Sequence, residues 1–321
     1  MPIKLDVKDR KILYELDINA RQTFSKIGKK VRLSKEVVNY RIKRLEKLGI
    51  IKGYYTLINM SRLGYLCNRF FIKFKNVSPK KEQEIIEFFV KHQKYWWVDS
   101  ISGFRDIGIA SWEKSINDCY KRKEELLMNF KQYIDIIEQS TYTGFYIYRR
   151  AYLVNKKTKD APQISYISWK KEDIDNIDIK ILRLIAGNAR KPLLEIAEEL
   201  NTTLTIVNYR IKKMIKNKVI ECFRSIIDLS KIGYYWYKIE FILKDNSKKQ
   251  EMLDYFSSHP NIVYAYLTTA EADLEVELEV ESYEKFREIL DDLRTRFEDA
   301  IESYKHLLWF KEHKILFFPV E

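Results

Sequence analysis

The feature that most constrains this chain is an internal repeat with a period of 169 residues. Residues 9–65 align with residues 178–234 without a gap, and 20 of these 57 positions are identical. Two short runs are kept letter for letter: VNYRIK at 38–43 and 207–212, and NAR at 19–21 and 188–190. This period is far longer than the ~20–50 residues of solenoid repeats. Each copy should therefore fold as a self-sufficient unit.

The first 50 residues of each copy predict a compact cluster of three helices. In the first copy, apolar residues recur at helical spacing in three short stretches: Ile12, Leu13 and Leu16; Phe24 and Ile27; Val38, Ile42 and Leu45. Ser34, and Thr203 in the second copy, stand where they can cap the third helix. Short helices with so little apolar surface can form only a small bundle of this kind.

The third predicted helix carries a polar and mostly basic face opposite its apolar stripe. Asn can pair with adenine and Lys with guanine, and Tyr or Arg can hold phosphates, when a helix enters the major groove. An exposed basic face is often only solvated. Packing does not require outward Asn, Tyr, Arg and Lys in both copies, however, so their repetition favours contact with double-stranded DNA. The candidate DNA-binding residues are Ser34, Lys35, Glu36, Asn39, Tyr40, Arg41, Lys43 and Arg44, and in the second copy Thr203, Thr205, Asn208, Tyr209, Arg210, Lys212 and Lys213.

Strand and helix signals alternate after each cluster. A β-rich stretch comes first, at 50–58 and 219–227. The order is then strand, helix, two strands, helix, strand, over 69–76, 79–92, 95–102, 106–112, 115–132 and 136–148 in the first copy. In the second copy it runs over 236–243, 247–258, 262–268, 273–280, 283–297 and 301–318. This βαββαβ order predicts a ferredoxin-like sandwich.

The fold class is therefore α+β, with two tandem units that each join a winged helix-turn-helix domain to a ferredoxin-like domain. A linker is expected at 155–171, which contains Pro162 and shows no hydrophobic period. The predicted domains are residues 1–53 and 54–154 in the first unit, and residues 172–224 and 225–321 in the second.

Positive charge is concentrated in the two predicted winged helix-turn-helix domains, which we call the heads. The chain carries a net charge of +12, but residues 1–160 hold 34 Lys and Arg against 18 Asp and Glu, whereas residues 161–321 hold 24 against 28. Residues 1–53 carry 15 basic and 6 acidic side chains, and residues 225–321 carry 12 and 20. This distribution fits a polyanionic partner at the heads, and it disfavours DNA contact in the last hundred residues.

Nothing in the sequence indicates catalysis or a metal. The cysteines and histidines are scattered, without CxxC or HExxH spacing, at Cys67, Cys119, Cys222, His92, His259, His306 and His313. We therefore expect no catalytic residue, cofactor or metal, and a protein that is not an enzyme. No apolar run of 18 residues occurs, and charges stand where a signal peptide needs an apolar centre. A cytoplasmic protein without membrane contact is expected.

Several of these landmarks together resemble the Lrp/AsnC family, the feast/famine transcription regulators. Leu5-Asp6, Asp9 and Ile12-Leu13 are similar to the family's opening LDxxDxxIL. Ser34 with VVNYRIKRLEKLGII is similar to its recognition helix, and NMSRLGY at 59–65 to its hinge. The second copy keeps TIVNYRIKKM and DLSKIGY. The likeness covers nearly the whole chain twice.

The resemblance implies a transcription regulator whose usual dimer is intramolecular here. Two unlike heads would favour an imperfect palindrome, and several such pseudo-dimers could assemble into a homo-oligomer. The family's Gly-x-x-Asp turn implies an effector site for a small molecule such as an amino acid at Gly103, Arg105 and Asp106; a plain hairpin turn is the alternative. The corresponding stretch at 270–273 begins with Ala in place of Gly.

Two other functional classes stay open. Siroheme decarboxylases resemble the same family and bind a tetrapyrrole, but their histidine-bearing, Arg-rich stretch has no counterpart in SISGFRDIGIASW or YLTTAEADLEVELEV. A non-catalytic module that binds other proteins is the second, since the acidic residues of 225–321 could form a docking face.

Overall fold

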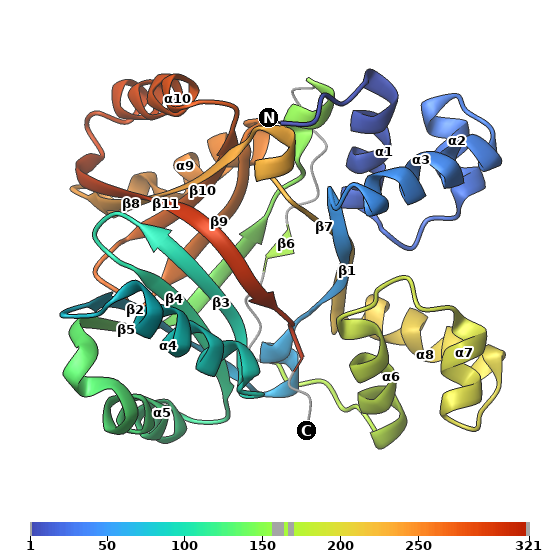
Figure 1. The fold of residues 1–321 in the computed structure, drawn as a ribbon, viewed down its shortest axis with the longest axis horizontal. Coiled ribbons are helices and arrows are strands. Elements are labelled where there is room, and N and C mark those ends of the chain that lie inside the picture. The colour runs from blue at the N-terminus through green and yellow to red at the C-terminus, as the bar shows by residue number, and fades with distance from the viewer. Residues whose placement is uncertain (1, 156–163, 166–169, 319–321) are drawn as a thin grey trace.

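The computed structural model describes residues 2–155, 164–165 and 170–318. Two helical heads lie side by side at one end of the molecule, and strands with covering helices form the other end (Figure 1). Most of the linker predicted at 155–171 lies outside the described residues. Within the described ranges, every helix is too short or too polar to cross a membrane.

Each head is the predicted cluster of three helices. The helices are α1 (Val7–Ile18), α2 (Phe24–Val31) and α3 (Lys35–Lys47) in the first copy, and α6 (Asn176–Ala186), α7 (Leu193–Glu199) and α8 (Leu204–Lys216) in the second. Side chains cap α1, α2 and α3 at Asp6, Thr23 and Ser34, so each helix starts where an orphan backbone N–H finds an acceptor.

A two-stranded ribbon joins the heads. Strand β1 (Ile51–Ile58) pairs antiparallel with β7 (Ile220–Ile227), which places one strand from each copy side by side. The β-rich stretches predicted from the sequence are confirmed, and each finds its partner in the other copy. The boundaries that we placed after residues 53 and 224 both fall inside these strands.

The remainder of each copy has the predicted βαββαβ order. The first copy contains β2 (Leu66–Phe74), α4 (Pro79–Lys91), β3 (Tyr95–Ser102), β4 (Ile107–Glu113), α5 (Ile116–Phe130) and β5 (Ile134–Ile147). The second contains β8 (Tyr235–Leu243), α9 (Lys249–Ser258), β9 (Ile262–Thr268), β10 (Leu274–Val280), α10 (Tyr283–Arg296) and β11 (Ile301–Ile315), and a short strand β6 (Ile164–Ser165) adds to β5. The strand orders β5-β2-β4-β3 and β11-β8-β10-β9 are those of the ferredoxin-like fold.

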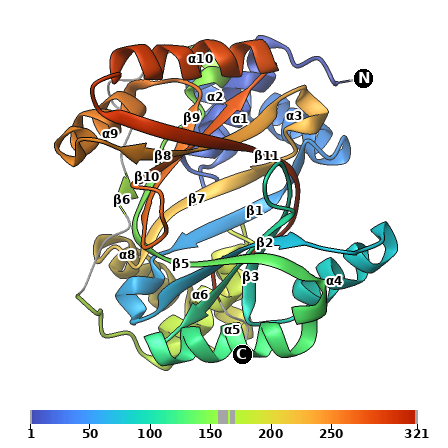
Figure 2. The same cartoon turned by 90° about the vertical axis from the view of Figure 1, so that its left-hand side faces the viewer.

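The two four-stranded sheets close on each other. Strand β3 pairs with β11, and β5 pairs with β9, so that eight strands form a continuous ring of hydrogen-bonded neighbours. Helices α4 and α5 cover one side of this ring, and α9 and α10 cover the opposite side (Figure 2). Their apolar faces pack on the outer surface of the strands in two separate clusters. The inner surface of the ring is left to other side chains.

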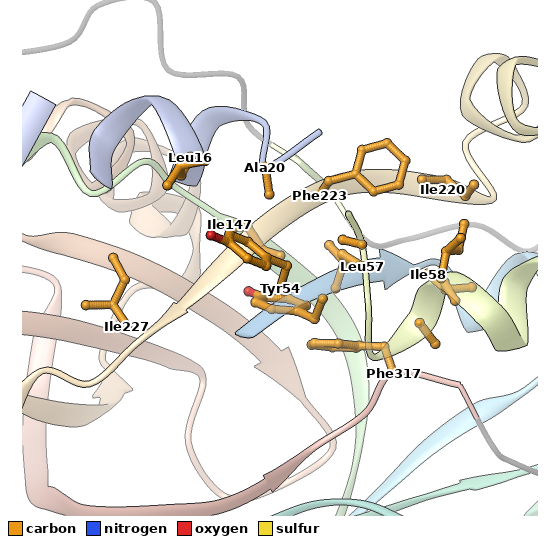
Figure 3. Close-up of a cluster of buried hydrophobic side chains, with 14 of the residues drawn as sticks. Leu16, Ala20, Tyr54, Leu57, Ile58, Ile147, Ile220, Phe223, Ile227 and Phe317 are labelled. Carbon is orange, nitrogen blue, oxygen red and sulfur yellow. The ribbon is translucent and has the colours of Figure 1, made fainter. Parts of the chain in front are cut away.

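One apolar cluster runs from both heads through the ribbon into the ring. It includes Leu16 and Ala20 from α1 and the segment that follows it, Phe223 from β7, Ile147 from β5 and Phe317 from the segment after β11 (Figure 3). Burial of this shared surface stabilises the heads against the ring. The ribbon therefore has apolar contacts on both of its faces, and the heads share one apolar core with the ring.

Candidate functional site

The recognition helices of the two heads are built alike. The Ser34 hydroxyl accepts a hydrogen bond from the Val37 backbone N–H at 3.2 Å, and the Thr203 hydroxyl accepts one from the Ile206 N–H at 3.3 Å. Both predicted DNA contacts thus serve as N-caps of α3 and α8. Each helix buries its apolar stripe, which is Val38, Ile42 and Leu45 in α3 and Val207, Ile211 and Met214 in α8.

Most of the predicted DNA-binding side chains are exposed on these helices. Tyr40 is 68% exposed and Tyr209 is 65% exposed, although both are large aromatic residues. Asn39 and Asn208 are half-buried beside them. The basic and polar residues of the same face are also exposed: Lys35, Glu36, Lys43, Arg44, Thr205, Lys212 and Lys213. A tyrosine hydroxyl on an exposed basic helix face can reach a phosphate oxygen of DNA.

The arginine of the repeated VNYRIK run has a structural role in both heads. Arg41 forms ion pairs with Asp6 at 2.7 Å and with Asp9 at 2.8 Å. In the second head, Arg210 forms the same pairs with Asp175 at 2.6 Å and Asp178 at 3.1 Å. Each arginine thereby fixes the recognition helix to the first helix of its head. The Arg44 guanidinium also contacts Asp9.

A reciprocal contact between the heads explains the repeated NAR run. The guanidinium of Arg21 donates to the carbonyls of Ala189 at 2.6 Å and Lys191 at 3.1 Å. Arg190 returns the contact by donating to the Ala20 carbonyl. The backbone N–H groups of the two alanines reach the ribbon, from Ala20 to Phe223 at 2.8 Å and from Ala189 to Tyr54 at 3.0 Å. Sequence analysis missed this role, although the exact repetition of NAR was its signal.

The Gly-x-x-Asp turn of the first copy anchors a hairpin. Gly103 has φ of +140°, a region that favours glycine. The Asp106 carboxylate accepts hydrogen bonds from the Lys73 ammonium and the Phe74 N–H, both at 2.7 Å, and Arg105 forms an ion pair with Glu138 at 2.6 Å. All three predicted effector residues therefore lie together, and the two charged ones are bonded to neighbouring strands.

A cavity of about 670 Å³ lies between the ribbon and the interior of the strand ring. Side chains from β1, β7 and seven of the eight ring strands line it, and most are aromatic. They include Tyr55, Phe71, Trp96, Trp97, Tyr142, Phe145, Trp236, Tyr264, Tyr266, Trp309 and Phe317. Sequence analysis did not find this cavity, because its walls come from both copies and meet only when the ring closes.

Buried ion pairs close the end of the cavity nearest to the first head. Arg150 pairs with Asp17 at 2.7 Å and with Glu279 at 2.8 Å, and Arg224 pairs with Asp17 at 2.5 Å. Burial opposes ionisation of Asp17, but the charges of Arg224 and Arg150 outweigh it and lower the pKa of this carboxyl. The network ties α1 to the ring across the ribbon.

Comparisons with known proteins assign the family. The model of the AsnC-type helix-turn-helix domain matches residues 5–46, and that of a winged helix-turn-helix DNA-binding domain matches residues 174–221. HTH-type transcriptional regulator Ptr1 of Methanocaldococcus jannaschii is 34% identical over 116 residues, which are 35% of this chain and 78% of that protein. The chain belongs to the Lrp/AsnC family. HTH-type transcriptional regulator LrpB of Bacillus subtilis is 30% identical over 120 residues, 37% of this chain and 80% of its own length. One Lrp/AsnC relative therefore corresponds to one copy of the repeat.

A solved structure shares the duplicated architecture. The siroheme decarboxylase NirDL, crystallised in complex with an iron-uroporphyrin III analogue, has a TM-score of 0.61 to this chain and covers 97% of it and 94% of its own chain. Its sequence is 12% identical. The likeness shows that the two proteins share one fold over nearly their whole length.

Proposed function

We propose that this chain is a sequence-specific DNA-binding transcription regulator that acts as an intramolecular pseudo-dimer. The observation that carries the proposal is the pair of recognition helices, α3 and α8, which present the same outward Asn, Tyr and Lys from two heads that are locked together by Arg21 and Arg190. Its relatives are named as transcriptional regulators, which supports the same function.

The target of two such heads is an imperfect palindrome. Position 36 is Glu in α3 and its counterpart in α8 is Thr205, and Lys35 corresponds to Leu204. The two helices therefore offer different groups to base edges at their N-terminal ends, where a recognition helix makes many of its base contacts. Half-sites that are related but not identical follow from this difference.

Capture of sheared genomic DNA at about 0.2 M salt tests the proposal, because nonspecific phosphate attraction is already weakened there. We expect a few fragments that share two unlike half-sites, and loss of their enrichment in a Tyr40→Ala, Tyr209→Ala double variant. Uniform weak binding by the wild-type protein would contradict sequence-specific regulation.

Two finer points belong to the same proposal. A small-molecule effector such as an amino acid would bind at the Gly103–Asp106 turn by competing with Glu138 for Arg105, so Arg105→Met should abolish its effect on DNA binding. Assembly of several pseudo-dimers would appear as a mass above that of one chain in light scattering at micromolar protein.

A tetrapyrrole enzyme is the second candidate, because the fold of NirDL and a large aromatic cavity both point to it. The residues present do not fit a carboxylate-rich macrocycle. The two buried arginines at the cavity, Arg69 and Arg150, are already paired with Glu275 and Glu279. Asp228, Glu277 and Glu312 also line the cavity, Lys52 is paired with Asp228 at 3.7 Å, and none of the described lining residues is a histidine.

Absorbance titration with iron-uroporphyrin III decides between the two candidates. We expect no saturable spectral change at micromolar protein. A one-to-one complex would favour the tetrapyrrole enzyme over the regulator.

A further inference from the structure

Strand β10 carries a row of three buried carboxylates on the inner face of the ring. Its sequence LEVELEV alternates, so that Leu274, Val276, Leu278 and Val280 face α9 and α10 while the glutamates face inward. Glu275, Glu277 and Glu279 are 1%, 3% and 1% exposed. Charged residues are almost never buried so deeply unless they are paired, so each of these carboxylates should have a cation.

The two outer carboxylates of the row are paired and the middle one is not. Glu275 forms a bidentate pair with Arg69, at 2.6 Å for both contacts, and binds the Lys238 ammonium at 2.5 Å. Glu279 binds Arg150. Glu277 lies opposite Lys238 across the strands, but that ammonium is held by Glu275. Among the described residues, Glu277 forms no ion pair.

Neutral donors and aromatic rings surround Glu277 instead. The Trp236 indole N–H donates to its carboxylate at 2.9 Å, and the Tyr266 hydroxyl also bonds to it. Burial raises the pKa of this carboxyl to about 7 in spite of Lys238 and these donors. The carboxylate lines the cavity, where a positive charge brought from outside could reach it.

The aromatic walls are suited to a cation. The Trp309 ring lies 5.3 Å from Trp236 and 5.1 Å from Trp97, and Phe71 is 5.9 Å from Trp309. The opposite edge of this wall already holds protein cations, since Arg69 and Lys238 each lie 4.4 Å from the Phe71 ring centroid. A ligand cation over such faces is attracted by the negative charge of the ring faces.

Two buried donors on the cavity wall lack an acceptor. The Trp309 indole N–H and the Ser225 hydroxyl have no hydrogen-bond partner among the described residues, and Ser225 is fully buried. The equivalent of Ser225 in the first copy, Thr56, donates to the Ile185 carbonyl at 2.6 Å. Buried polar groups normally find partners, so water is expected beside these two donors.

The cavity has a route to solvent. Phe310 and Tyr235 belong to its lining and are 74% and 50% exposed, which places the opening beside β8 and β11. Its volume of about 670 Å³ is within the ~300–1,000 Å³ of small-molecule sites.

We infer that this cavity binds an organic cation, a protonated amine carried on a flat aromatic body, with the ammonium beside Glu277 and the body between the Trp236, Trp309 and Tyr266 rings. The ammonium completes the row of ion pairs on β10. The Glu277 carboxylate disfavours an anionic ligand of the same size at this position. The site is separate from the Gly103–Asp106 turn, and none of those turn residues lines the cavity.

Binding at this site would reach the heads through the ribbon. Tyr55 of β1 and Ser225, Ile226 and Ile227 of β7 form part of the cavity wall, and the same strands carry both heads. This consequence rests on the proposed regulatory function. The binding itself does not, so it is measured without DNA.

Calorimetric titration with three probes of one shape tests the inference. Tryptamine is cationic, tryptophol is neutral and indole-3-propionate is anionic, and all three carry the same indole body. We expect tryptamine to bind at least about tenfold more tightly than tryptophol, and indole-3-propionate not to bind measurably. Equal affinities for tryptamine and tryptophol, no binding of tryptamine, or preference for the anion would overturn the inference.

A matched pair of variants locates the charge. Glu277→Gln keeps the shape of the side chain and should lower tryptamine affinity to that of tryptophol while leaving tryptophol unchanged. Glu302→Gln, on the exposed face of β11, should leave both affinities unchanged. Retention of the tryptamine preference in Glu277→Gln would reject this location. The probe series in the wild-type protein stands whether or not the variant folds.

DNA binding separates this inference from the proposed function. If tryptamine binds as expected but the protein selects no DNA fragments, the regulator proposal fails and the ligand site stands. If fragments are selected and tryptamine does not bind, the reverse holds.

Discussion

Strands β4 and β10 hold the same place in the two copies, and their inner faces are opposites. The inner positions of β4 are Gly108, Ala110 and Trp112, whereas those of β10 are three glutamates. A side chain at Gly108 would collide with Trp97 and Phe71, because aromatic rings fill that side of the ring. The Trp96 and Trp112 rings stack at 4.9 Å beside it.

The recognition helices, in contrast, stayed alike. Asn39, Tyr40 and Lys43 have identical counterparts in α8. The two copies thus share the outer surface of their recognition helices, whereas the inner faces of β4 and β10 differ. This difference fits the two proposals, that the heads act as a pair and that the interior of the ring holds one asymmetric site.

The largest expected effect on stability comes from removing Arg150, which pairs with Glu279 of β10 and with Asp17 of α1. Arg150→Met leaves Glu279 and Asp17 with fewer donors in a buried setting, and breaking such a pair costs about 3–5 kcal/mol. Chemical denaturation should show this loss in the free energy of unfolding. Lys121→Met, at an exposed position of α5, serves as the control. A loss below about 1 kcal/mol would show that the network contributes little to stability.

The unpaired carboxylate should make stability depend on pH. The pKa of Glu277 is about 7 in the folded chain and near 4.5 when unfolded, so the folded state binds the proton more tightly. The contribution of Glu277 to the free energy of unfolding therefore falls by about 3 kcal/mol as pH rises from about 4.5 to 7. Lys238 and Glu275 also act on the Glu277 carboxyl. The pH dependence of the wild type must therefore be compared with that of a variant that keeps the shape of the side chain.

Glu277→Gln is that variant. The variant should be more stable than the wild type at pH 8 by up to about 3 kcal/mol, with the difference vanishing near pH 4. Denaturation curves at both pH values measure it. A variant that is less stable at pH 8 would mean that Glu277 has a cation in solution.

The pairing of the heads can be broken at its reciprocal contact. Arg21→Met removes charged hydrogen bonds to two carbonyls of the other head, worth about 1.5–3 kcal/mol, and Arg190→Met should have a similar effect. The double variant should also tolerate altered spacing between half-sites in a gel-shift series. Arg183→Met, on the exposed side of α6, should change neither stability nor spacing.

The smallest expected effect is the change in the salt dependence of DNA affinity when one exposed cation is removed from either recognition helix. Lys43→Ala and Lys212→Ala each remove one exposed cation, so each should lower the slope of log affinity against log salt by about 1. The first head holds 15 basic residues against 6 acidic ones over 1–53, whereas residues 170–224 hold 12 against 8. Neutralisation of the exposed cations of α3 should therefore reduce the slope more than neutralisation of those of α8, and equal slopes would contradict unequal heads.

Local sequence patterns were sufficient to predict the helices and strands and to predict which side chains lie on the outer face of the heads. Helical spacing around Val38 and the cap at Ser34 predicted α3. The same spacing places Tyr40 on the opposite, exposed face of the helix. The arginine of VNYRIK was predicted to contact DNA as well, and the structure commits Arg41 to Asp6 and Asp9. Periodicity shows which face a residue occupies, but it does not show what lies 35 positions away.

What the sequence determined by itself is the repeat, the order of elements and the family, because these depend on the spacing of neighbours along the chain. The tertiary structure alone decided that β1 pairs with β7, that the two sheets close into a ring, and that Glu277 lies inside it with no ion pair to any described residue. In an alternating strand such as LEVELEV, the polar face is normally the solvated one. Here the first copy covers it, and only long-range pairing between strands more than 100 residues apart makes that face an interior.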